Sequence, residues 1–260
     1  MEVEADGSGS LVEGGADFDI LVVSGAVSLG SLTGIETLEF ASGAALTLTG
    51  AQFANGLAVN AAVTGSGALI VNMNAGTSFF ATQMSFAAGI ALTVNGTGGV
   101  DVIKGALGAA MLANGGDGAD QIRTGNLVDT IDGGAGNDKI MGLGGADLLT
   151  GGAGADQFRY LFAADSGLGS AADRILDFTN GEDKLDFRVL DANPNIAGRQ
   201  ALSFIGTAAF ATNGTAQLRY ADSGADTLIQ IDLNGDGAAD MEIVLAGHAG
   251  QALTGTDFLF

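Results

Sequence analysis

Aspartate recurs at every ninth position in the glycine-rich stretch between residues 115 and 159. The stretch divides into nonapeptides whose sixth residue is aspartate and whose eighth is a large apolar residue. The aspartates are Asp120, Asp129, Asp138, Asp147 and Asp156, and the apolar residues are Ile122, Ile131, Ile140, Leu149 and Phe158. Carboxylates at a fixed spacing, beside glycines that leave backbone carbonyls accessible, offer the oxygen ligands that Ca²⁺ prefers.

The spacing also predicts the elements that must position these carboxylates. The first six residues of each nonapeptide form a sharp glycine-rich turn, and the last three form a short strand with one apolar side chain pointing inward. Two nonapeptides make one coil of 18 residues, so alternate repeats fall on opposite edges. We therefore expect Asp120, Asp138 and Asp156 on one edge, and Asp129 and Asp147 on the other.

The thin core of such a coil favours a bound cation. Each coil buries two sizeable side chains, worth about 1.5–3 kcal/mol apiece, whereas ordering each residue costs about 1 kcal/mol or more. The carboxylate rows would also repel one another, so Ca²⁺ is the predicted cofactor and Asx turns without metal are the alternative. The expected metal ligands are the five repeat aspartates, Asp101 in the upstream nonapeptide GTGGVDVIK, and the turn residues Gly116, Asp117, Gly118, Gly134, Gly136, Asn137, Gly152 and Gly154.

The pattern GGxGxDxUx of these nonapeptides resembles the calcium-binding repeat of the RTX (repeats-in-toxin) family. Two repeats depart from it, because Thr124 and Leu127 replace glycine in the repeat 124–132 and Leu143 replaces glycine in the repeat 142–150. We expect those two turns to bind calcium weakly or not at all. The resemblance implies export through the ABC transporter of a type I secretion system and folding in extracellular calcium.

A second calcium motif lies between residues 232 and 240, in the sequence DLNGDGAAD. Its candidate ligands are Asp232, Asn234, Asp236 and Asp240. They match the first half of an EF-hand loop, but Ile243 stands where that loop has its bidentate glutamate. The flanking segments alternate between apolar and polar residues, which predicts a β-hairpin whose tip binds Ca²⁺.

Residues 173–187, DRILDFTNGEDKLDF, resemble the segment that follows the repeats in RTX proteins and in the C-terminal domain of serralysin-like proteases. Its carboxylates, Asp173, Asp177, Asp183 and Asp186, either hold a capping calcium or belong to a solvated turn. The chain ends in LTGTDFLF, where Asp257 precedes terminal hydrophobic residues, as in the uncleaved signals of type I secretion. The resemblance covers about residues 96–260 and implies a secreted, extracellular protein.

Upstream of the repeats, residues 37–104 carry a period of 23 residues, marked by the pentapeptides ALTLT, ALIVN and ALTVN. The period predicts a parallel β-solenoid of roughly three coils, with an antiparallel sandwich as the alternative. The expected rows are Leu46/Leu69/Leu92, Leu48/Val71/Val94, Phe40/Val63/Phe86, Leu38/Ala61/Met84 and Leu57/Phe80/Ile103. Thr49, Asn72 and Asn95 form either an outward polar ladder or ordinary turns.

Composition narrows the class of function. With 30 acidic and 9 basic residues, a net charge of −21, the 260-residue chain is not expected to bind nucleic acid or an anionic membrane surface. It has no cysteine, and no apolar run is long enough for a transmembrane segment. The single histidine, His248, leaves no HExxH zinc site, and neither a GxSxG nor a phosphate-loop motif occurs, so no enzymatic activity is expected.

These patterns predict an all-β fold, in which a parallel β-solenoid continues into a calcium-binding β-roll capped by a C-terminal β-rich domain. The predicted parts are an N-terminal cap or strand segment (1–36), the solenoid (37–104), the β-roll (105–160) and the C-terminal β domain with a type I secretion signal (161–260). The expected role is structural or associated with the cell surface or matrix, like a surface-layer (S-layer) protein or an adhesin, with self-assembly through the solenoid edges. The alternative is the export and folding module of an RTX exoenzyme whose catalytic domain lies elsewhere.

Overall fold

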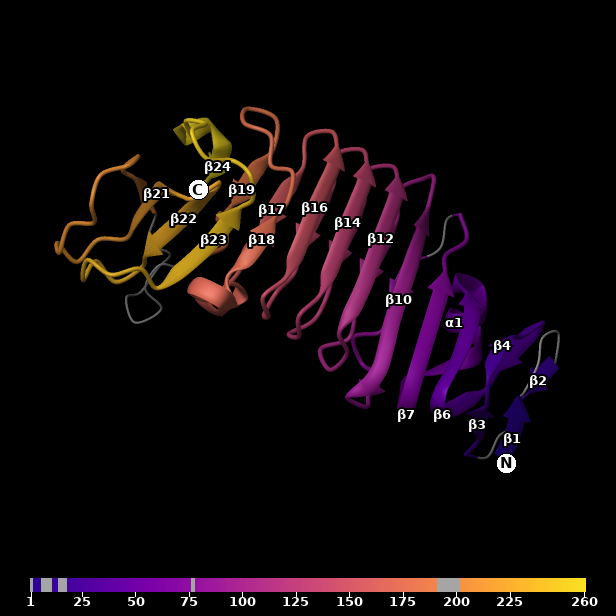
Figure 1. Ribbon diagram of the computed structural model, residues 1–260. Helices are drawn as coiled ribbons and strands as arrows, with labels where there is room; N and C mark the ends of the chain where they lie inside the picture. The colour runs from indigo at the N-terminus through magenta and orange to yellow at the C-terminus, as the bar shows by residue number, and fades with distance from the viewer. Residues whose placement is uncertain (1, 6–10, 14–17, 76–77, 191–201) are drawn as a thin grey trace. The chain divides into compact units, whose positions relative to one another are not determined.

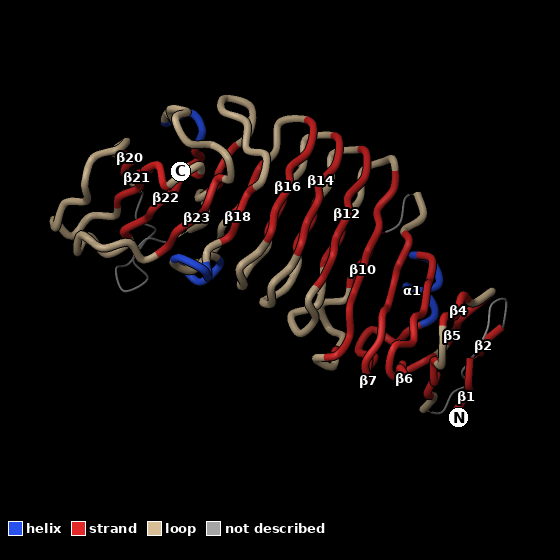
Figure 2. Tube along the Cα trace, in the orientation of Figure 1, coloured by secondary structure: helices blue, strands red, loops and turns tan. Residues whose placement is uncertain are grey.

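The computed structural model describes residues 2–5, 11–13, 18–75, 78–190 and 202–260. The chain divides into two compact units, Met1–Leu127 and Val128–Phe260. Each unit stacks short strands in parallel, coil upon coil, so the predicted all-β fold built on a parallel β-solenoid is confirmed (Figures 1 and 2). No helix among the described residues is long and apolar enough to cross a membrane.

The first unit carries its longest strands in one sheet. In spatial order these are β1 (Glu2–Ala5), β3 (Ile20–Val23), β6 (Ile35–Thr49), β7 (Leu57–Asn72), β10 (Gly89–Thr97) and β12 (Met111–Asp117), with β4 (Ala26–Ser28) also on β6 and β9 (Ser85–Phe86) also on β7. A second sheet contains β8 (Ser78–Phe80), β11 (Val102–Lys104) and β13 (Gln121–Arg123), and β2 (Leu11–Glu13) pairs with β5 (Ser31–Thr33). The helix α1 (Gly50–Gly56) connects β6 to β7.

The second unit has the same two-sided plan. One side holds β14 (Thr130–Ala135), β16 (Leu148–Ala153), β18 (Asp173–Ile175), β23 (Met241–Leu245), β22 (Asp226–Asp232), β21 (Gln217–Ser223) and β20 (Ser203–Phe204) in this spatial order. The other holds β15 (Lys139–Met141), β17 (Gln157–Arg159), β19 (Lys184–Asp186) and β24 (Phe258–Leu259). Three short 3₁₀ turns, η1 (Ala163–Asp165), η2 (Gly169–Ala171) and η3 (Gly255–Asp257), lie in the connections.

The single apolar residue of each nonapeptide strand forms the core of the β-roll, as predicted. Ile131 pairs with Leu149 across β14 and β16, and Ile140 pairs with Phe158 across β15 and β17. All four side chains are at most 1% exposed. Because one residue per strand points inward, each coil stays thin.

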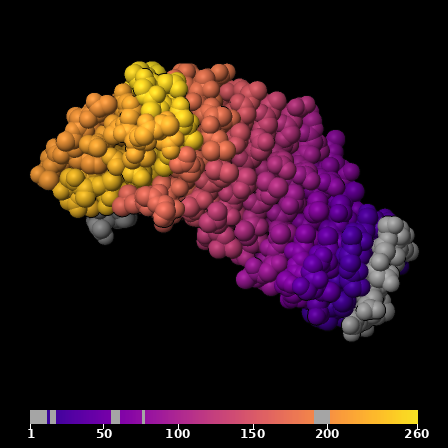
Figure 3. Space-filling model, in the orientation of Figure 1, coloured from indigo at the N-terminus to yellow at the C-terminus, as the bar shows by residue number. Residues whose placement is uncertain are grey.

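The coil continues beyond the last nonapeptide. Although the nine-residue period stops near Tyr160, β18 adds to β16 with Leu149 opposite Ile175, and β19 adds to β17 with Phe158 opposite Leu185. The C-terminal residues complete the stack, because β24 pairs in parallel with β19 and buries Phe258. These residues, yellow in Figure 3, pack among the coils of the second unit.

Among the described residues, antiparallel pairing occurs only at the C-terminal hairpin and the strand beside it. β22 pairs antiparallel with β23, and β21 pairs antiparallel with β22. The predicted hairpin at residues 226–247 is therefore confirmed. Its first strand, β22, also pairs with β21 along its other edge. The other side of β23 joins β18 in parallel, so the hairpin extends the solenoid sheet.

The 23-residue period describes the upstream coils only in part. Leu46 lies opposite Leu69 and Leu69 opposite Leu92, with the Leu48/Val71/Val94 row beside them, as predicted. In contrast, Leu38 lies opposite Val63 instead of Ala61, and Phe40 lies opposite Gly65. The strand β6 has an irregularity between Phe40 and Ala44, which shifts the register by two residues before the period resumes.

The fifth predicted row is wrong by one residue. Ile103 lies opposite Phe79, and Phe80 lies opposite Lys104. Since successive strand residues face opposite sides, Phe79 is 1% exposed in the core and Phe80 is 54% exposed outside. The backbone of Leu57 pairs with Ile35, which also differs from the predicted row.

The outward polar ladder is present and longer than expected. The Asn95 side-chain amide donates to Asn72 Oδ1 at 2.8 Å, and the Asn114 amide donates to Asn95 Oδ1 at 2.7 Å. Thr49 lies opposite Asn72 at the next position along the row. The ladder joins β7, β10 and β12 on the outer face of the first unit.

Candidate calcium sites along the aspartate rows

Each repeat aspartate stands at the end of its glycine turn, one residue before its short strand. Asp120, Asp129, Asp138, Asp147 and Asp156 are all at most 1% exposed, and so is Asp101 in the upstream nonapeptide. Burial of so many carboxylates is unusual unless each is paired or bound to a cation. The partners of their oxygens therefore decide what the rows can do.

One oxygen of Asp120, Asp147 and Asp156 links successive coils. The backbone N–H of Asp138 donates to Asp156 Oδ1, and that of Asp129 donates to Asp147 Oδ1, each at 2.8 Å. In the first unit the N–H of Asp101 donates to Asp120 Oδ1 at 2.7 Å. Asp138 and Asp156 thus share one edge and Asp129 and Asp147 share another, as the coil of 18 residues predicted.

The second oxygen has no such partner along much of the rows. Among the described residues, Oδ2 of Asp147, Asp156 and Asp173, and Oδ1 of Asp101, are buried without a hydrogen bond. A buried acceptor without a partner costs about 1–3 kcal/mol, and more when it is charged. These oxygens are the observation that calls for a cation.

The buried carboxyls also hold their protons more tightly than usual. Burial raises the pKa of Asp147 to about 7. The hydrogen bond from the N–H of Asp129 lowers this pKa, whereas the carboxylates of Asp129 and Asp165 raise it further. Burial raises the pKa of Asp156 to about 6, and the carboxylates of Asp183, Asp138 and Asp177 add to the effect. Burial, with the Asp147 and Asp165 carboxylates, raises the pKa of Asp173 to about 8. A divalent cation at the edge would reverse these shifts.

Glycine is required where consecutive turns approach each other. A Cβ at Gly152 would collide with the carbonyl oxygen of Gly134, and one at Gly154 with that of Gly136, one coil earlier. Both Gly152 and Gly154 have positive φ, +93° and +133°. The backbone carbonyls of successive turns are therefore held close together at the edge where the carboxylates lie.

The carboxylate oxygen without a partner faces this same turn. A Cβ at Gly151 would collide with Asp156 Oδ2, and one at Gly142 would collide with Asp147 Oδ2. Among the described residues, no three acidic or histidine side chains gather into a metal-binding group. Each site therefore offers one or two carboxylates with backbone carbonyls, and this all-oxygen donor set fits Ca²⁺ better than Zn²⁺.

The rows extend into residues that the nine-residue spacing did not identify. The N–H of Asp147 donates to Asp173 Oδ1, and the N–H of Asp156 donates to Asp183 Oδ1, both at 2.9 Å. Asp173 and Asp183 are thus the next members of the two rows, although they lie 26 and 27 residues downstream. In the sequence both belong to the segment 173–187, whose carboxylates were expected either to hold a capping calcium or to lie in a solvated turn, and neither was assigned to a row.

The other two carboxylates of the 173–187 segment have different roles. Asp177 accepts the backbone N–H groups of Gly151 and Gly152, at 2.9 and 2.8 Å, and so caps a repeat turn. Asp186 forms ion pairs with Arg159 and Arg188, both at 2.9 Å. Burial alone would raise the pKa of Asp186, but the two guanidinium groups hold it below its usual value. Asp186 is therefore already neutralised by protein cations.

The two predicted turn ligands with polar side chains, Asp117 and Asn137, lie at the surface. Asn137 Oδ1 accepts the N–H of Ala155 at 2.9 Å, which ties its turn to the next coil. Asp117 is exposed at the end of β12. In the irregular turn, Leu143 has the positive φ of the glycine that it replaces, +63°. That turn keeps the repeat geometry at the cost of a strained backbone.

The hairpin tip is stabilised by its own hydrogen bonds. Asp232 Oδ1 accepts the N–H of Gly235 at 2.6 Å, and its Oδ2 accepts that of Gly237 at 2.8 Å. Asp240 Oδ2 accepts the N–H of Leu233 at 2.7 Å, and Asn234 Oδ1 accepts that of Asp236 at 2.8 Å. The four predicted ligands thus gather in one loop, and their oxygens bind amides of that loop.

The single histidine takes part in packing. His248 is 2% exposed, with Nε2 at 2.6 Å from Asn180 Oδ1 and Nδ1 at 3.3 Å from Thr227 Oγ1. Burial lowers its pKa, against the nearby Asp222 and Asp257 carboxylates. These contacts connect the end of the hairpin to the loop before β19.

Comparison with known proteins agrees with this geometry. The family model described as "Peptidase M10 serralysin C terminal" matches residues 45–260. None of the curated protein sequences matches the chain. Among solved structures, the AlgE6R3 subunit of the Azotobacter vinelandii mannuronan C5-epimerase is 29% identical, covering 65% of this chain and 78% of that chain, with a TM-score of 0.31.

The matched domain is the non-catalytic C-terminal part of serralysin, an RTX-type domain associated with type I secretion. The match includes the β-roll, the aspartate rows and the hairpin, together with most of the upstream solenoid. The chain therefore belongs to the serralysin C-terminal family of RTX-type calcium-binding β-roll domains.

Proposed function

We propose that this chain is a secreted protein that folds when Ca²⁺ fills its aspartate rows, and that it has a structural or surface-associated role of S-layer or adhesin type. The observation that carries the proposal is the set of buried carboxylate oxygens without hydrogen-bond partners at the coil edges. The proposal covers the calcium sites, export through the type I ABC transporter and the extracellular location. No catalytic role is assigned.

The ligands follow from the rows. In the second unit, Asp138 and Asp156 would hold calcium on one edge, and Asp129 and Asp147 on the other, with carbonyls of the turns that contain Gly134, Gly136, Gly152 and Gly154. In the first unit, Asp101 and Asp120 would do so with the turn of Gly116 and Gly118. When bound, Ca²⁺ supplies the positive charge that the buried carboxylates lack.

The same rows account for export before folding. At low calcium the buried carboxylates must either repel one another or take up protons, so the coils are marginally stable. Sites with extracellular-type affinity, with a Kd of about 10⁻⁴–10⁻³ M, fill outside the cell. A tenfold excess of free calcium over Kd stabilises the fold by about 1.4 kcal/mol per site. Several sites along a row thus suffice to favour the folded chain.

Far-ultraviolet circular dichroism of the whole chain, with calcium or with EGTA, tests the proposal. We expect β-sheet signal to increase on addition of calcium, and magnesium to be a weak substitute because it prefers a small octahedral shell with retained water. No gain of β signal with calcium would contradict calcium-driven folding. Electron microscopy in calcium would test self-assembly through the solenoid edges, because ordered assemblies would support it and a dispersed monomer would contradict it.

A second candidate function is supported by the family match. The matched domain is the C-terminal part of a protease, so this chain is alternatively the export and folding module of an exoenzyme. A natural reading frame that continues upstream of Met1 into a catalytic domain would support this candidate. A reading frame that begins at Met1 would favour the structural role.

A further inference from the structure

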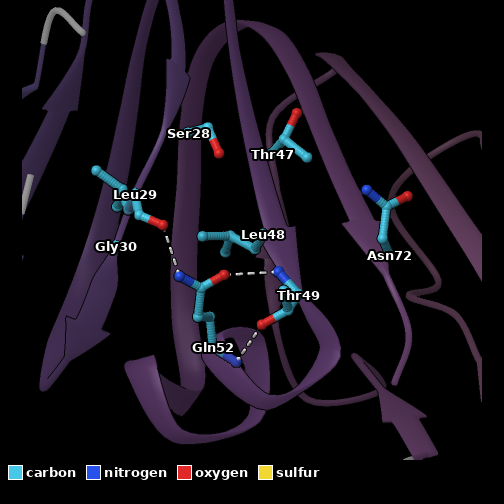
Figure 4. Close-up of a pocket in the computed structure, with 8 residues that line it drawn as sticks. All are labelled: Ser28, Leu29, Gly30, Thr47, Leu48, Thr49, Gln52 and Asn72. Carbon is cyan, nitrogen blue, oxygen red and sulfur yellow. Dashed lines mark hydrogen bonds between the residues drawn. The ribbon is translucent and has the colours of Figure 1, made fainter. Parts of the chain in front are cut away.

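A polar pocket lies on the first unit, away from the aspartate rows. It has a volume of about 420 Å³ and is lined by Ser28, Leu29, Gly30, Thr47, Leu48, Thr49, Gln52 and Asn72. Pockets that bind small molecules usually measure about 300–1,000 Å³. Figure 4 shows these residues around the space between β4, the end of β6 and the helix α1.

The pocket wall is fixed by Gln52. Its side-chain amide donates to the carbonyl of Leu29 at 2.8 Å, and its Oε1 accepts the N–H of Thr49 at 2.7 Å. The hydroxyl of Thr49 in turn accepts the N–H of Gln52 at 3.2 Å. Gln52 thus joins the chain before β5 to the end of β6, so the pocket is formed before any ligand arrives.

Three other polar side chains at the pocket, Ser28, Thr47 and Asn72, are available to bind a ligand. Ser28 lies directly opposite Thr47 in the β4–β6 pair, and neither hydroxyl has a hydrogen bond to another described residue. Asn72 Oδ1 accepts a hydrogen bond from Asn95, but the Asn72 amide nitrogen donates to no described residue. In Figure 4 this nitrogen is on the side of Thr47 and the oxygen points away.

The asparagine ladder strengthens this donor. The Asn114 amide donates to the oxygen of Asn95, and the Asn95 amide donates to the oxygen of Asn72, so both hydrogen bonds run in one direction. Successive hydrogen bonds of this kind polarise one another. The Asn72 amide nitrogen is therefore the donor end of a polarised row, and it lies at the rim of the pocket.

From these groups we propose that the pocket binds a neutral saccharide. Two hydroxyls, which donate and accept, and one amide donor match the neighbouring hydroxyls of a sugar ring. The lining residues include no charged side chain, which disfavours phosphate or a metal ion, and no aromatic side chain, which disfavours a nucleobase. The net charge of −21 further disfavours acidic sugars. If the protein is surface-associated, as proposed above, neutral saccharides are the class of ligand that it would bind. This binding would not involve the calcium sites.

The test is a titration of the whole ¹⁵N-labelled chain, in calcium, with neutral trisaccharides: isomaltotriose, cellotriose and mannotriose. We expect at least one to shift the Asn72 side-chain NH₂ signals and the amides of Ser28 and Thr47 saturably. Each lost hydrogen bond should weaken binding about two- to tenfold, so Thr47→Val and Ser28→Ala should each raise Kd by that factor. Thr93→Val, in the same outward row but outside the pocket, should leave Kd unchanged.

Three results would overturn the proposal. One is the absence of saturable shifts with all three sugars up to about 20 mM, above the millimolar range in which a few neutral hydrogen bonds give measurable binding. Another is an equal loss of affinity in Thr93→Val, and the third is tighter binding of tri-galacturonate, an acidic sugar. Circular dichroism of each variant in calcium reports folding separately, so failure of the pocket and failure of the calcium proposal are distinguishable.

Discussion

At the scale of single residues, the two carboxylate oxygens of Asp147 and of Asp156 have different surroundings. In Asp147 and Asp156, Oδ1 accepts an N–H from the previous coil, whereas Oδ2 is buried and has no hydrogen-bond partner among the described residues. The first contact builds the coil and needs no metal. The second oxygen is what makes the folded state sensitive to cations and to protons.

Asp156→Asn separates these two roles. The amide oxygen can still accept the N–H of Asp138, so the coil contact survives, but the charge that attracts calcium is lost. We expect the stabilisation by calcium to fall by about 1.4 kcal/mol at tenfold excess over Kd. The matched control is Asp132→Asn, an exposed aspartate on β14. Thermal denaturation at several calcium concentrations measures both, and an equal loss in the control would contradict the assignment.

The raised pKa values predict how stability depends on pH without calcium. Asp147, Asp156 and Asp173 have folded-state pKa values of about 7, 6 and 8, above the ordinary aspartate pKa of 3.8. Between pH 4 and 8 the folded state therefore binds more protons than the unfolded state, so its stability falls as pH rises. In EGTA we expect the melting temperature to be higher at pH 5 than at pH 8.

Calcium should reverse this trend, because metal binding requires the deprotonated carboxylates. In saturating calcium, the melting temperature at pH 8 should equal or exceed that at pH 5. A metal-free protein that becomes more stable from pH 5 to pH 8 would show that these carboxyls are not buried as described. Differential scanning calorimetry across this range measures both curves.

The aspartates of the repeats could be placed in rows from the sequence, whereas Asp173 and Asp183 could be named as possible calcium ligands but not placed in a row. A strict spacing of nine residues identified Asp129, Asp138, Asp147 and Asp156 because one strand and one turn alternate without insertion. Asp173 and Asp183 follow longer connections that include η1 and η2, so their spacing carries no period. Hydrogen bonding to the previous coil, which only the fold shows, places them in the rows.

At the scale of elements, the turns are limited by contact between neighbouring backbones. Gly152→Ala would bring a Cβ against the carbonyl of Gly134 and would also impose a positive φ on alanine. Gly181 also has a positive φ, but nothing lies within 4 Å of a Cβ there. Gly181→Ala should cost about 1 kcal/mol from backbone strain alone, and Gly152→Ala about 3 kcal/mol or more because a clash is added.

Urea denaturation in calcium measures the difference between these two variants. If both lose the same free energy of unfolding, the close approach of successive turns is not what limits the coil. A larger loss for Gly152→Ala, with a smaller response to calcium, would link the packing of the turns to the metal sites.

The upstream strands show what a sequence period can and cannot determine. The rows of Leu46, Leu69 and Leu92 follow the period because ALTLT, ALIVN and ALTVN occupy equivalent strands. Next to irregular segments the period fails. Before Ala44 the register differs by two residues, which leaves the same faces inward, whereas at Phe79 it differs by one residue, which exchanges them. With Phe79 and Phe80 adjacent, sequence alone did not show which one enters the core.

Substitution of these two phenylalanines tests the observed register. Phe79 is buried and its ring centroid lies 4.6 Å from that of Phe53, so Phe79→Ala should cost about 3–5 kcal/mol. Phe80 is exposed and has one cation–π contact, with Lys104 Nζ at 5.1 Å, so Phe80→Ala should cost about 1 kcal/mol or less. If urea denaturation instead showed a larger loss of unfolding free energy for Phe80→Ala than for Phe79→Ala, the register expected from the 23-residue period would be the correct one.

At the scale of the whole molecule, two kinds of coil occur in one chain. The coils of β3, β6, β7 and β10 bury wide apolar rows, including Leu21, Leu38, Leu46, Leu69 and Leu92. Among the described residues, the buried side-chain oxygens without partners lie between Asp101 and Asp173, and none lies in those upstream coils. The upstream coils are stabilised by their apolar core. The coils with the aspartate rows depend on neutralisation of their buried carboxylates.

This contrast predicts where calcium acts along the chain. In EGTA, we expect amides in residues 35–72 to keep protection from hydrogen exchange, because their stability comes from apolar burial. Amides of Asp129, Asp138, Asp147 and Asp156, which donate along the rows, should exchange rapidly and become protected in calcium. Hydrogen–deuterium exchange followed by mass spectrometry resolves the two regions. Equal protection of both regions in EGTA would show that the β-roll folds without metal, and loss of protection in both would show that the apolar coils need the calcium-bound rows to fold.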